Sequence, residues 1–321
     1  MEPLTLPEEH RYVVYPIKHH DVWNAYKIQM GHFWTAEELD LSQDTKDWGT
    51  LSDDERYFIK HILAFFASSD GIVMENITGS FIADVSWVEA KIAYGFQAMI
   101  EGVHAEVYSL LIDTFVKDTD EKDRLLRGIE TIPCVAKKAE WALKWTDAGS
   151  ESFARRLVAF ACVEGIFFSG SFCAIYWLKQ RGVMPGLTTS NEFIARDEGL
   201  HTDFACLLYS HIEGRLTPET LHSIVRDAVA IEQEFICESL PCRLLGMNAE
   251  MMGRYIEFVA DRLCVQLGYL KAFNTPNPFS FMERISLEGK DNFFEKRSSS
   301  YAKAGVAVEP EAMGFSTDAD F

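Results

Sequence analysis

Two Glu-x-x-His sequences, far apart in the chain, constrain the fold more than any other feature. Glu101 and His104 lie within 94–111, YGFQAMIEGVHAEVYSLL, and Glu198 and His201 lie within IARDEGLHTDF. Both stretches lack Pro and are rich in helix formers, so each predicts a helix with Glu and His on one face. Two such pairs on two helices are typical of a four-helix bundle that holds two metal ions. Such a site needs one further carboxylate from each of the two remaining helices.

Two isolated acids in apolar stretches are the candidates for these carboxylates. Asp70 follows LAFFASS and precedes GIVM, and Glu164 lies in the middle of 157–178, LVAFACVEGIFFSGSFCAIYWL. An unpaired buried carboxylate is costly, so each of them requires a cation. Each acid also precedes one Glu-x-x-His helix at a similar interval, which indicates two equivalent helix pairs. Four carboxylates neutralise two divalent ions, and oxygen ligands with two imidazoles suit iron or manganese better than zinc.

The remaining pattern predicts an all-α protein, because no run of residues has the character of a strand. We expect an N-terminal arm over 1–18, a helical domain over 19–288 and a flexible C-terminal tail over 289–321. Within the domain, 118–147 predicts two short helices with Pro133 in the turn between them.

Helix starts are predicted by local capping sequences. Capping boxes occur at 52–55, 86–89 and 189–192, each with Ser or Thr followed by Glu three residues later. Thr217-Pro218 predicts an N-cap with Pro in the first helical position, and Asn248 begins the last long helix.

Composition argues against several classes of function. A formal net charge of −19 is unsuited to a nucleic-acid surface, which needs clustered Lys and Arg. The stretch 157–178 is long enough to span a membrane, but the central Glu164 favours a buried bundle helix. Seven Cys without a C-x-x-C pair, and no N-terminal apolar signal segment, indicate an intracellular protein.

Several residues on the same helical faces as the expected ligands have two interpretations on pattern alone. Tyr108 lies four residues after His104, on the same helical stripe, and taken alone it is more often a packed core tyrosine. Phe168 and Phe172 follow Glu164 on its helical face, and Ile194 precedes Glu198 by one turn. Core packing explains them, and a dry wall around a reactive group beside the metals explains them equally.

Longer blocks of sequence connect the chain to a known family. The blocks include FFASSDGIVMEN, YGFQAMIEGVHAEVYSLLID, IETIPCVAKKAEWALKW, AFACVEGIFFSGSF, SNEFIARDEGLHTDFACLL and the terminal FSTDADF. Over nearly its whole length the chain resembles the small, radical-carrying subunit of class I ribonucleotide reductase, in its eukaryotic and especially its plant form. The resemblance implies a ferritin-like helical bundle, with a four-helix di-iron carboxylate core and additional helices.

The resemblance also implies roles for individual residues. It assigns Asp70, Glu101 and His104 to the iron nearer the tyrosine, and Glu164, Glu198 and His201 to the second iron. Glu101 and Glu198 hold the bridging positions, and manganese stays open as an alternative metal. It assigns the radical to Tyr108 and the apolar radical pocket to Phe168, Phe172 and Ile194.

A partner follows from the same resemblance. In such enzymes the radical passes to a cysteine of a separate large catalytic subunit, which reduces ribonucleoside diphosphates to deoxyribonucleoside diphosphates. Trp34, Asp197 and Tyr301 match the residues of the transfer route. The terminal segment that docks on the large subunit includes Phe315, Asp318, Asp320 and Phe321. A cytoplasmic dimer is expected, either a homodimer or a heterodimer with a sister small subunit.

Some positions depart from the family pattern, and two other functions stay open. Ser298 to Ser300 stand where Val-Gly-Glu is usual, Thr189 replaces Phe, Gly102-Val103 replaces Asn-Ile, and Ser280 replaces Asp. None of these changes removes a metal ligand. The alternatives are another di-iron enzyme, such as a fatty-acyl desaturase or a ferritin-like oxidase, and a non-catalytic paralogue that pairs with an active subunit.

Overall fold

The structure is a computed structural model that describes residues 4–6, 12–145, 151–239 and 241–282. The chain divides into two compact units, Met1–Pro278 and Phe279–Phe321. The first unit holds all the helices described below. The second unit is described only over residues 279–282, so the predicted tail lies outside the described residues.

All the regular secondary structure in the described part of the chain is helical, as predicted. The α-helices are α1 (His20–Gly31), α2 (Ser42–Trp48), α3 (Asp53–Asn76), α4 (Ile82–Asp84), α5 (Val88–Phe115), α6 (Thr119–Leu126), α7 (Gly128–Thr131), α8 (Pro133–Lys144), α9 (Phe153–Cys162), α10 (Ser169–Gln180), α11 (Pro185–Ser210), α12 (Pro218–Gln233) and α13 (Ala249–Gln266). Three π-helices, Ile77–Phe81, Val163–Phe167 and Glu234–Ser239, and two 3₁₀ helices, Ala36–Glu38 and Cys242–Leu245, complete the set.

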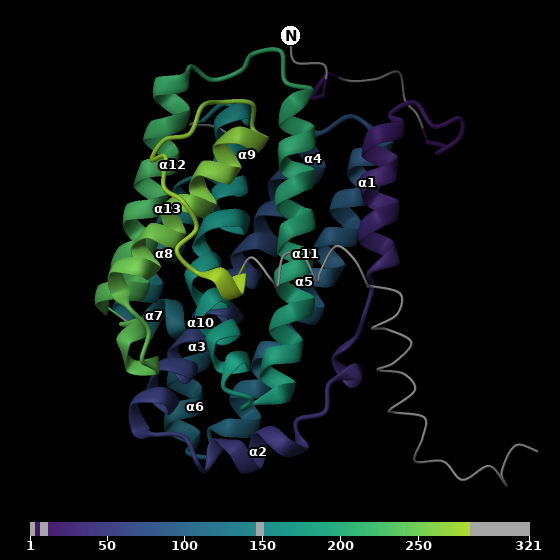
Figure 1. The fold of residues 1–321 in the computed structure, drawn as a ribbon. Helices are drawn as coiled ribbons and strands as arrows, with labels where there is room; N and C mark the ends of the chain where they lie inside the picture. Colours follow the sequence, from purple (N-terminus) through teal and green to yellow (C-terminus); the bar gives the residue numbers. More distant parts are fainter. Residues whose placement is uncertain (1–3, 7–11, 146–150, 240, 283–321) are drawn as a thin grey trace, which may run out of the picture. The chain divides into compact units, whose positions relative to one another are not determined.

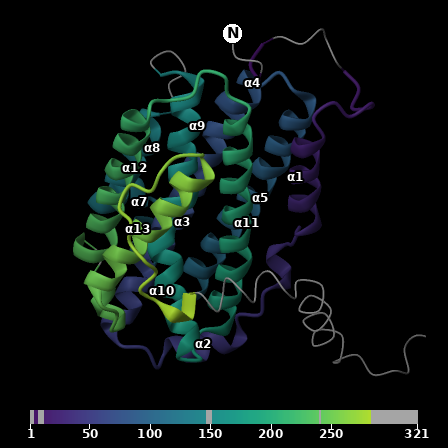
Figure 2. The same cartoon turned by 45° about the horizontal axis from the view of Figure 1, so that its top comes forward.

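Four long helical segments form the core of the first unit. Helix α3 packs along α5, and α9 packs along α11, while the π-helix 163–167 joins α9 to α10. Helix α1 lies against α5 on one side, and α12 and α13 cover α9 on the other side (Figure 1 and Figure 2). The two Glu-x-x-His sequences lie on α5 and α11, so the packing faces of these helices meet inside the bundle.

The segment with the character of a membrane span is a core element. Residues Phe153–Gln180 are long and apolar enough to cross a membrane, but 94% of the most apolar window is buried inside the protein. The sequence pattern predicts one continuous helix here. The structure divides it into α9, the π-helix 163–167 and α10, with a turn at Phe168.

Several predicted helix starts are confirmed. The Ser52 side chain accepts a hydrogen bond from the Glu55 amide, and the Glu55 side chain accepts one from the Ser52 amide, which is the full capping box. Thr217 caps α12 and Asn248 caps α13 in the same way, each through its side-chain oxygen. Local sequence therefore determines where these three helices begin.

Two predicted capping boxes are wrong. Helix α5 begins at Val88 without a side-chain cap, and the Ser86 hydroxyl instead donates to the Leu4 carbonyl, 3.0 Å away. Helix α11 begins at Pro185, so Thr189 lies inside it rather than at its N-cap. In both cases the groups near the helix start bond to residues distant in sequence, and the local capping sequence does not form its cap.

Carboxylates from α2 cap the N-terminus of α11. The Asp44 side chain is fully buried and accepts hydrogen bonds from the amides of Gly186 and Leu187, each at 2.7 Å. Asp47 accepts from the Met184 amide at 2.8 Å. These carboxylates accept hydrogen bonds from the free amides at the helix N-terminus, and the helix dipole also favours negative charge there. This contact fixes the start of the helix that carries Glu198 and His201.

The short helices between α5 and α9 also differ from the prediction. The described residues form three helices there, α6, α7 and α8, rather than two. Pro133 is the first residue of α8, where a missing amide hydrogen costs nothing, rather than a turn residue.

Candidate metal centre

The six predicted ligands converge in the middle of the bundle. Asp70 comes from α3, Glu101 and His104 come from α5, Glu164 comes from the π-helix 163–167, and Glu198 and His201 come from α11. Their ligand atoms form two groups, Asp70 with Glu101 and His104, and Glu101 with Glu164, Glu198 and His201. Within each group the ligand atoms lie within 4.8 Å of one another. All six side chains are at most 2% exposed.

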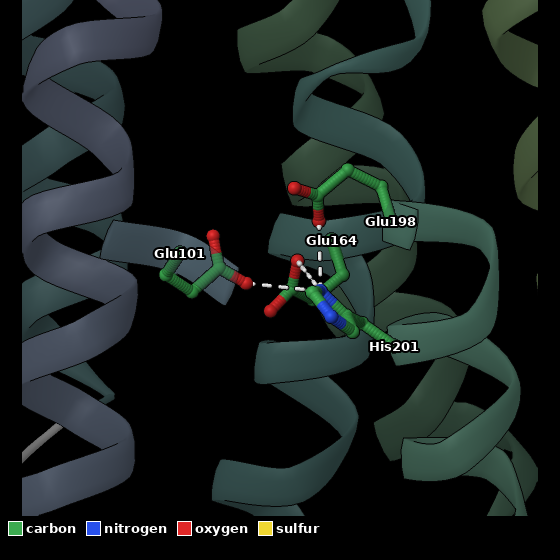
Figure 3. Close-up of side chains that lie close together, drawn as sticks. All are labelled: Glu101, Glu164, Glu198 and His201. Carbon is green, nitrogen blue, oxygen red and sulfur yellow. Dashed lines mark ion pairs between the residues drawn. The ribbon is translucent and has the colours of Figure 1, made fainter. Parts of the chain in front are cut away.

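Figure 3 shows how the second group is arranged around His201. The carboxylates of Glu101 and Glu198 approach its Nδ1 from different helices, at 2.9 Å and 3.4 Å, and Glu164 lies 3.9 Å away. Glu101 belongs to both groups, so it is placed to bridge two ions. Glu198 is placed similarly, because its Oε1 also lies 3.1 Å from Nδ1 of His104.

The oxygen and nitrogen atoms of this cluster that could bind a metal have no hydrogen-bond partner outside the cluster. Both oxygens of Asp70, Glu101 and Glu198, one oxygen of Glu164, and Nδ1 of both histidines are buried, and where these atoms make polar contacts, the contacts are ion pairs within the cluster. Buried polar atoms are nearly always bonded, and isolated buried charges are costly. A pair of divalent cations would satisfy these atoms together, so the residues present fit a two-metal centre.

The electrostatics of the cluster agree with this interpretation. Burial and the neighbouring charge of Glu101 raise the pKa of Asp70, and burial and Glu198 raise the pKa of Glu164. For the histidines, burial works in the opposite direction, but the surrounding carboxylates raise the pKa of both His104 and His201. Without metal, Asp70 and Glu164 hold protons that the cations would replace, whereas hydrogen bonds with Glu164, His104 and His201 outweigh burial and lower the pKa of Glu198.

A hydrogen-bonded chain leads away from His104. Its Nε2 donates to Oδ2 of Asp197 at 3.2 Å, and Trp34 Nε1 donates to the same oxygen at 2.7 Å. Arg196 donates to Oδ1 of Asp197 at 2.9 Å and 3.1 Å. Because the Asp197 oxygen can only accept, Nε2 carries the proton in this bond, and Nδ1 of His104 is the nitrogen that faces the carboxylates and could bind a metal. The structure therefore brings together Trp34, Asp197 and His104, as the resemblance implied.

Tyr108 is buried one turn beyond His104, and its hydroxyl has no hydrogen-bond partner. Burial and the charge of Asp70 raise the pKa of Tyr108, so the phenol keeps its proton. Phe168 and Phe172 are buried with ring centroids 5.7 Å apart, and Ile194 is fully buried on α11. These apolar side chains are the ones expected to form the pocket.

Sequence reasoning missed Phe66, the aromatic ring that stacks on the tyrosine. The Phe66 and Tyr108 ring centroids lie 4.6 Å apart with an interplanar angle of 23°. The Phe66 ring centroid also lies 5.7 Å from that of Phe168 and 5.4 Å from that of Phe172. Its position could have indicated this role, because Phe66 lies one turn before Asp70 on the same face of α3.

Sequence reasoning also missed Gln97, which bonds a predicted metal ligand. Its Nε2 donates to Oε1 of Glu164 at 3.1 Å, and the side chain is fully buried. Gln97 precedes Glu101 by one turn on α5, so it shares the face of the ligands. The bond holds one oxygen of Glu164 and leaves the other to face the cluster.

The remaining predicted functional residues, Tyr301, Phe315, Asp318, Asp320 and Phe321, lie outside the described residues.

Comparison with known proteins agrees with this geometry. A family model described as "Ribonucleotide reductase, small chain" matches residues 11–278. The chain belongs to this family. It is 59% identical to the ribonucleoside-diphosphate reductase small chain of Nicotiana tabacum, over 100% of this chain and 98% of that one. It is 58% identical to the small chain of vaccinia virus (strain Ankara), over 100% of both chains.

Solved structures show the same fold. A yeast ribonucleotide reductase protein, the Rnr4 homodimer of Saccharomyces cerevisiae, superposes with a TM-score of 0.81 at 40% identity, covering 93% of this chain and 92% of that one. The dimanganese(II)-NrdF of Streptococcus sanguinis gives 0.73 at 18% identity, covering 88% and 99%. At that identity the second likeness concerns the fold alone.

The resemblance inferred from sequence is therefore confirmed, with plant and viral relatives of similar identity. The chain is a small subunit of ribonucleoside-diphosphate reductase, an enzyme that also requires a large subunit. Its buried carboxylate and histidine cluster is consistent with the metal centre of such a subunit.

Proposed function

We propose that the two ligand groups hold two iron ions and that Tyr108 carries the radical that the enzyme uses. The observation that carries this proposal is the convergence of nine buried ligand atoms without hydrogen-bond partners outside the cluster, one helical turn from an unpartnered phenol. When bound, the metal pair supplies, with dioxygen, the oxidising power that removes an electron and a proton from the phenol.

The chain's own residues prepare the tyrosine for this step. Tyr108 holds its proton at the hydroxyl, because burial and nearby carboxylates raise its pKa. The Phe66 ring stacks on the phenol, and the rings of Phe168 and Phe172 pack in turn against Phe66. A dry pocket without hydrogen-bond donors keeps water and reductants from the radical.

Iron rather than manganese is part of the proposal. Four carboxylates and two imidazoles suit both metals, and the Streptococcus relative of the same fold is described as dimanganese(II). Metal analysis of protein purified from its native cells, by mass spectrometry, would separate the two. Two irons per chain is the expected result.

We further propose that the radical leaves through Asp197 and Trp34. The bond from His104 to Asp197 and the bond from Trp34 to Asp197 form a continuous path away from the cluster. Tyr301 would continue the path, and Phe315, Asp318, Asp320 and Phe321 would dock on the large subunit. Deleting 301–321 should leave metal binding unchanged and abolish deoxyribonucleotide formation with a matching large subunit.

We also propose a dimeric assembly and a cytoplasmic location. The yeast relative is described as a homodimer, which supports a dimer of this chain, with itself or with a sister small subunit. The seven cysteines all lie in the described part of the chain and form no disulfide bond there, which supports a location in the reducing cytoplasm. Analytical ultracentrifugation and imaging of a fluorescent fusion would test these points.

The direct test of the proposed function is electron paramagnetic resonance. Adding ferrous iron and oxygen to the metal-free protein should produce a sharp tyrosyl signal. In Tyr108→Phe the signal should vanish, while iron binding and the unfolding transition stay close to those of the wild type. A signal of unchanged intensity in this variant would place the radical elsewhere.

A further inference from the structure

The helical segment that carries Glu164 is broken at Phe168, four residues after it. Residues Val163–Phe167 form a π-helix, Phe168 is in a turn, and α10 begins at Ser169. A π-segment changes the register of the backbone hydrogen bonds, so groups at its end need other partners. Whatever fixes this break also fixes the direction in which Glu164 points.

Side chains bond three backbone groups at this break. The Ser169 hydroxyl donates to the Ile166 carbonyl at 2.7 Å. Lys138 Nζ, from α8, donates to the Phe167 carbonyl at 2.5 Å. The Gly170 amide donates to Oε1 of Glu232, from α12, at 3.1 Å. Two of the three bonds therefore come from other helices.

Lys138 and Glu232 also bond each other. Lys138 Nζ lies 2.5 Å from Oε2 of Glu232, and the two side chains are 1% and 0% exposed. Nζ also lies 3.6 Å from the centre of the Phe65 ring. The ammonium therefore has a carbonyl, a carboxylate and a ring face as partners, and each oxygen of Glu232 has one donor.

The surroundings are shaped for this arrangement. A Cβ atom at Gly170 would lie 2.7 Å from Oε1 of Glu232 and 3.1 Å from Ile236, so only glycine allows the carboxylate to approach. Burial lowers the pKa of Lys138 to about 8 and raises that of Glu232 to about 7. A buried ion pair with such desolvation adds little or nothing to stability compared with an apolar pair. Stability alone is thus a poor reason for its presence.

We propose that Lys138 and Glu232 are positioning residues for the metal ligand Glu164. They hold the carbonyl and the amide on the two sides of Phe168, and so fix the end of the π-helix relative to α8 and α12. Neither side chain touches the ligand atoms. This inference rests on the metal centre proposed above, and it adds residues that lie outside that centre.

The chain offers a matched control for a test. Lys137 and Glu234 form an ion pair between α8 and the π-helix that follows α12, but their side chains are 49% and 42% exposed. The test variant is Lys138→Met/Glu232→Leu, which replaces both buried charges by apolar side chains of similar volume. The control variant is Lys137→Met/Glu234→Leu.

Three measurements on full-length, metal-free protein separate positioning from stability. They are the urea midpoint, amide hydrogen exchange of peptides covering 163–172, and anaerobic calorimetric titration with ferrous iron. For the test variant we expect exchange in 163–172 faster by roughly tenfold or more and one site weakened roughly 10- to 100-fold. The urea midpoint should fall as well, because the Phe167 carbonyl and the Gly170 amide lose their partners. The control should match the wild type in all three.

Wild-type exchange and wild-type iron affinity in the test variant would overturn the inference. If that variant does not fold, Lys138→Met/Glu232→Gln takes its place, because the glutamine keeps an oxygen for the Gly170 amide. The criteria stay the same: weaker iron binding and faster exchange at Phe168. If the wild type itself binds fewer than two irons, the proposed function fails. The exchange data alone then decide whether the pair holds the π-helix.

Discussion

At the scale of single residues, the site depends on partners that hold the ligands as much as on the ligands. Asp197 accepts hydrogen bonds from His104 and Trp34 on one oxygen and from Arg196 on the other. This network keeps the His104 ring in one tautomer and one orientation, with Nδ1 toward Glu101 and Glu198. Gln97 orients the Glu164 carboxylate by donating a hydrogen bond to one of its oxygens.

Replacing Asp197 by Asn should therefore weaken one metal site without unfolding the protein. The neutral amide orients His104 less firmly, and loss of such outer partners lowers metal affinity roughly 10- to 100-fold. Anaerobic titration with ferrous iron measures the change. Asp203→Asn on the same helix, where the side chain is exposed, is the control. Equal affinities in the two variants would show that Asp197 does not support the metal site.

A second prediction concerns Phe66, which is fully buried against Tyr108. Phe66→Ala should lower the free energy of unfolding by about 3–5 kcal/mol, because a cavity replaces the ring. It should also shorten the lifetime of the proposed radical, since water gains access to the phenol. Urea denaturation and the decay of the paramagnetic signal test the two effects. The more conservative Phe66→Leu should show less of both, and a wild-type radical lifetime in Phe66→Ala would contradict the dry-pocket role.

At the scale of helices, local sequence predicted some boundaries and missed others. The caps at Ser52, Thr217 and Asn248 act on their own helices, so pattern reasoning found them. The start of α11 depends on Asp44 of a different helix, a tertiary contact without a local signature. The π-helix around Glu164 has the same residue types as an α-helix, so it could not be predicted from the residues that form it.

The corrected start of α11 can be tested by comparing Asp44→Ala with Thr189→Ala. Asp44→Ala leaves the Gly186 and Leu187 amides without their acceptor, and each unsatisfied buried donor costs about 1–3 kcal/mol. We therefore expect a loss of roughly 2–4 kcal/mol in unfolding free energy from urea denaturation. Thr189→Ala should change it by less than about 0.5 kcal/mol, because no cap is lost. The opposite order would restore the capping box at 189–192.

The cap of α3 should give a pH-dependent contribution to stability. Burial tends to raise the pKa of Glu55, but hydrogen bonds from the Ser52 amide and from Arg181 lower it below 4.5, its ordinary value. A carboxyl whose pKa is lower in the folded state stabilises the protein above the unfolded value, and the contribution disappears as the pH falls through the folded value. Glu55→Gln should thus be less stable than the wild type at pH 7 and equally stable in acid. A difference that persists or grows in acid would contradict this.

At the scale of the whole molecule, the fold class, the family and the six clustered side chains could all be predicted from the sequence. Two Glu-x-x-His pairs and two isolated acids in apolar helices are together specific to a two-metal helical bundle, which is why these predictions succeeded. The aromatic and hydrogen-bonding partners Phe66, Gln97, Lys138 and Glu232 were not predicted, because each depends on packing between helices. The predicted roles of Tyr301 and the terminal segment concern residues beyond those described.

The most direct test of the two-metal centre is anomalous X-ray diffraction at the iron absorption edge, from crystals loaded with ferrous iron without oxygen. We expect two peaks inside the bundle, one bounded by Asp70, Glu101 and His104 and the other bounded by Glu101, Glu164, Glu198 and His201. Crystals in which the iron peaks lie elsewhere, or in which these side chains bond one another and hold no metal, would contradict it.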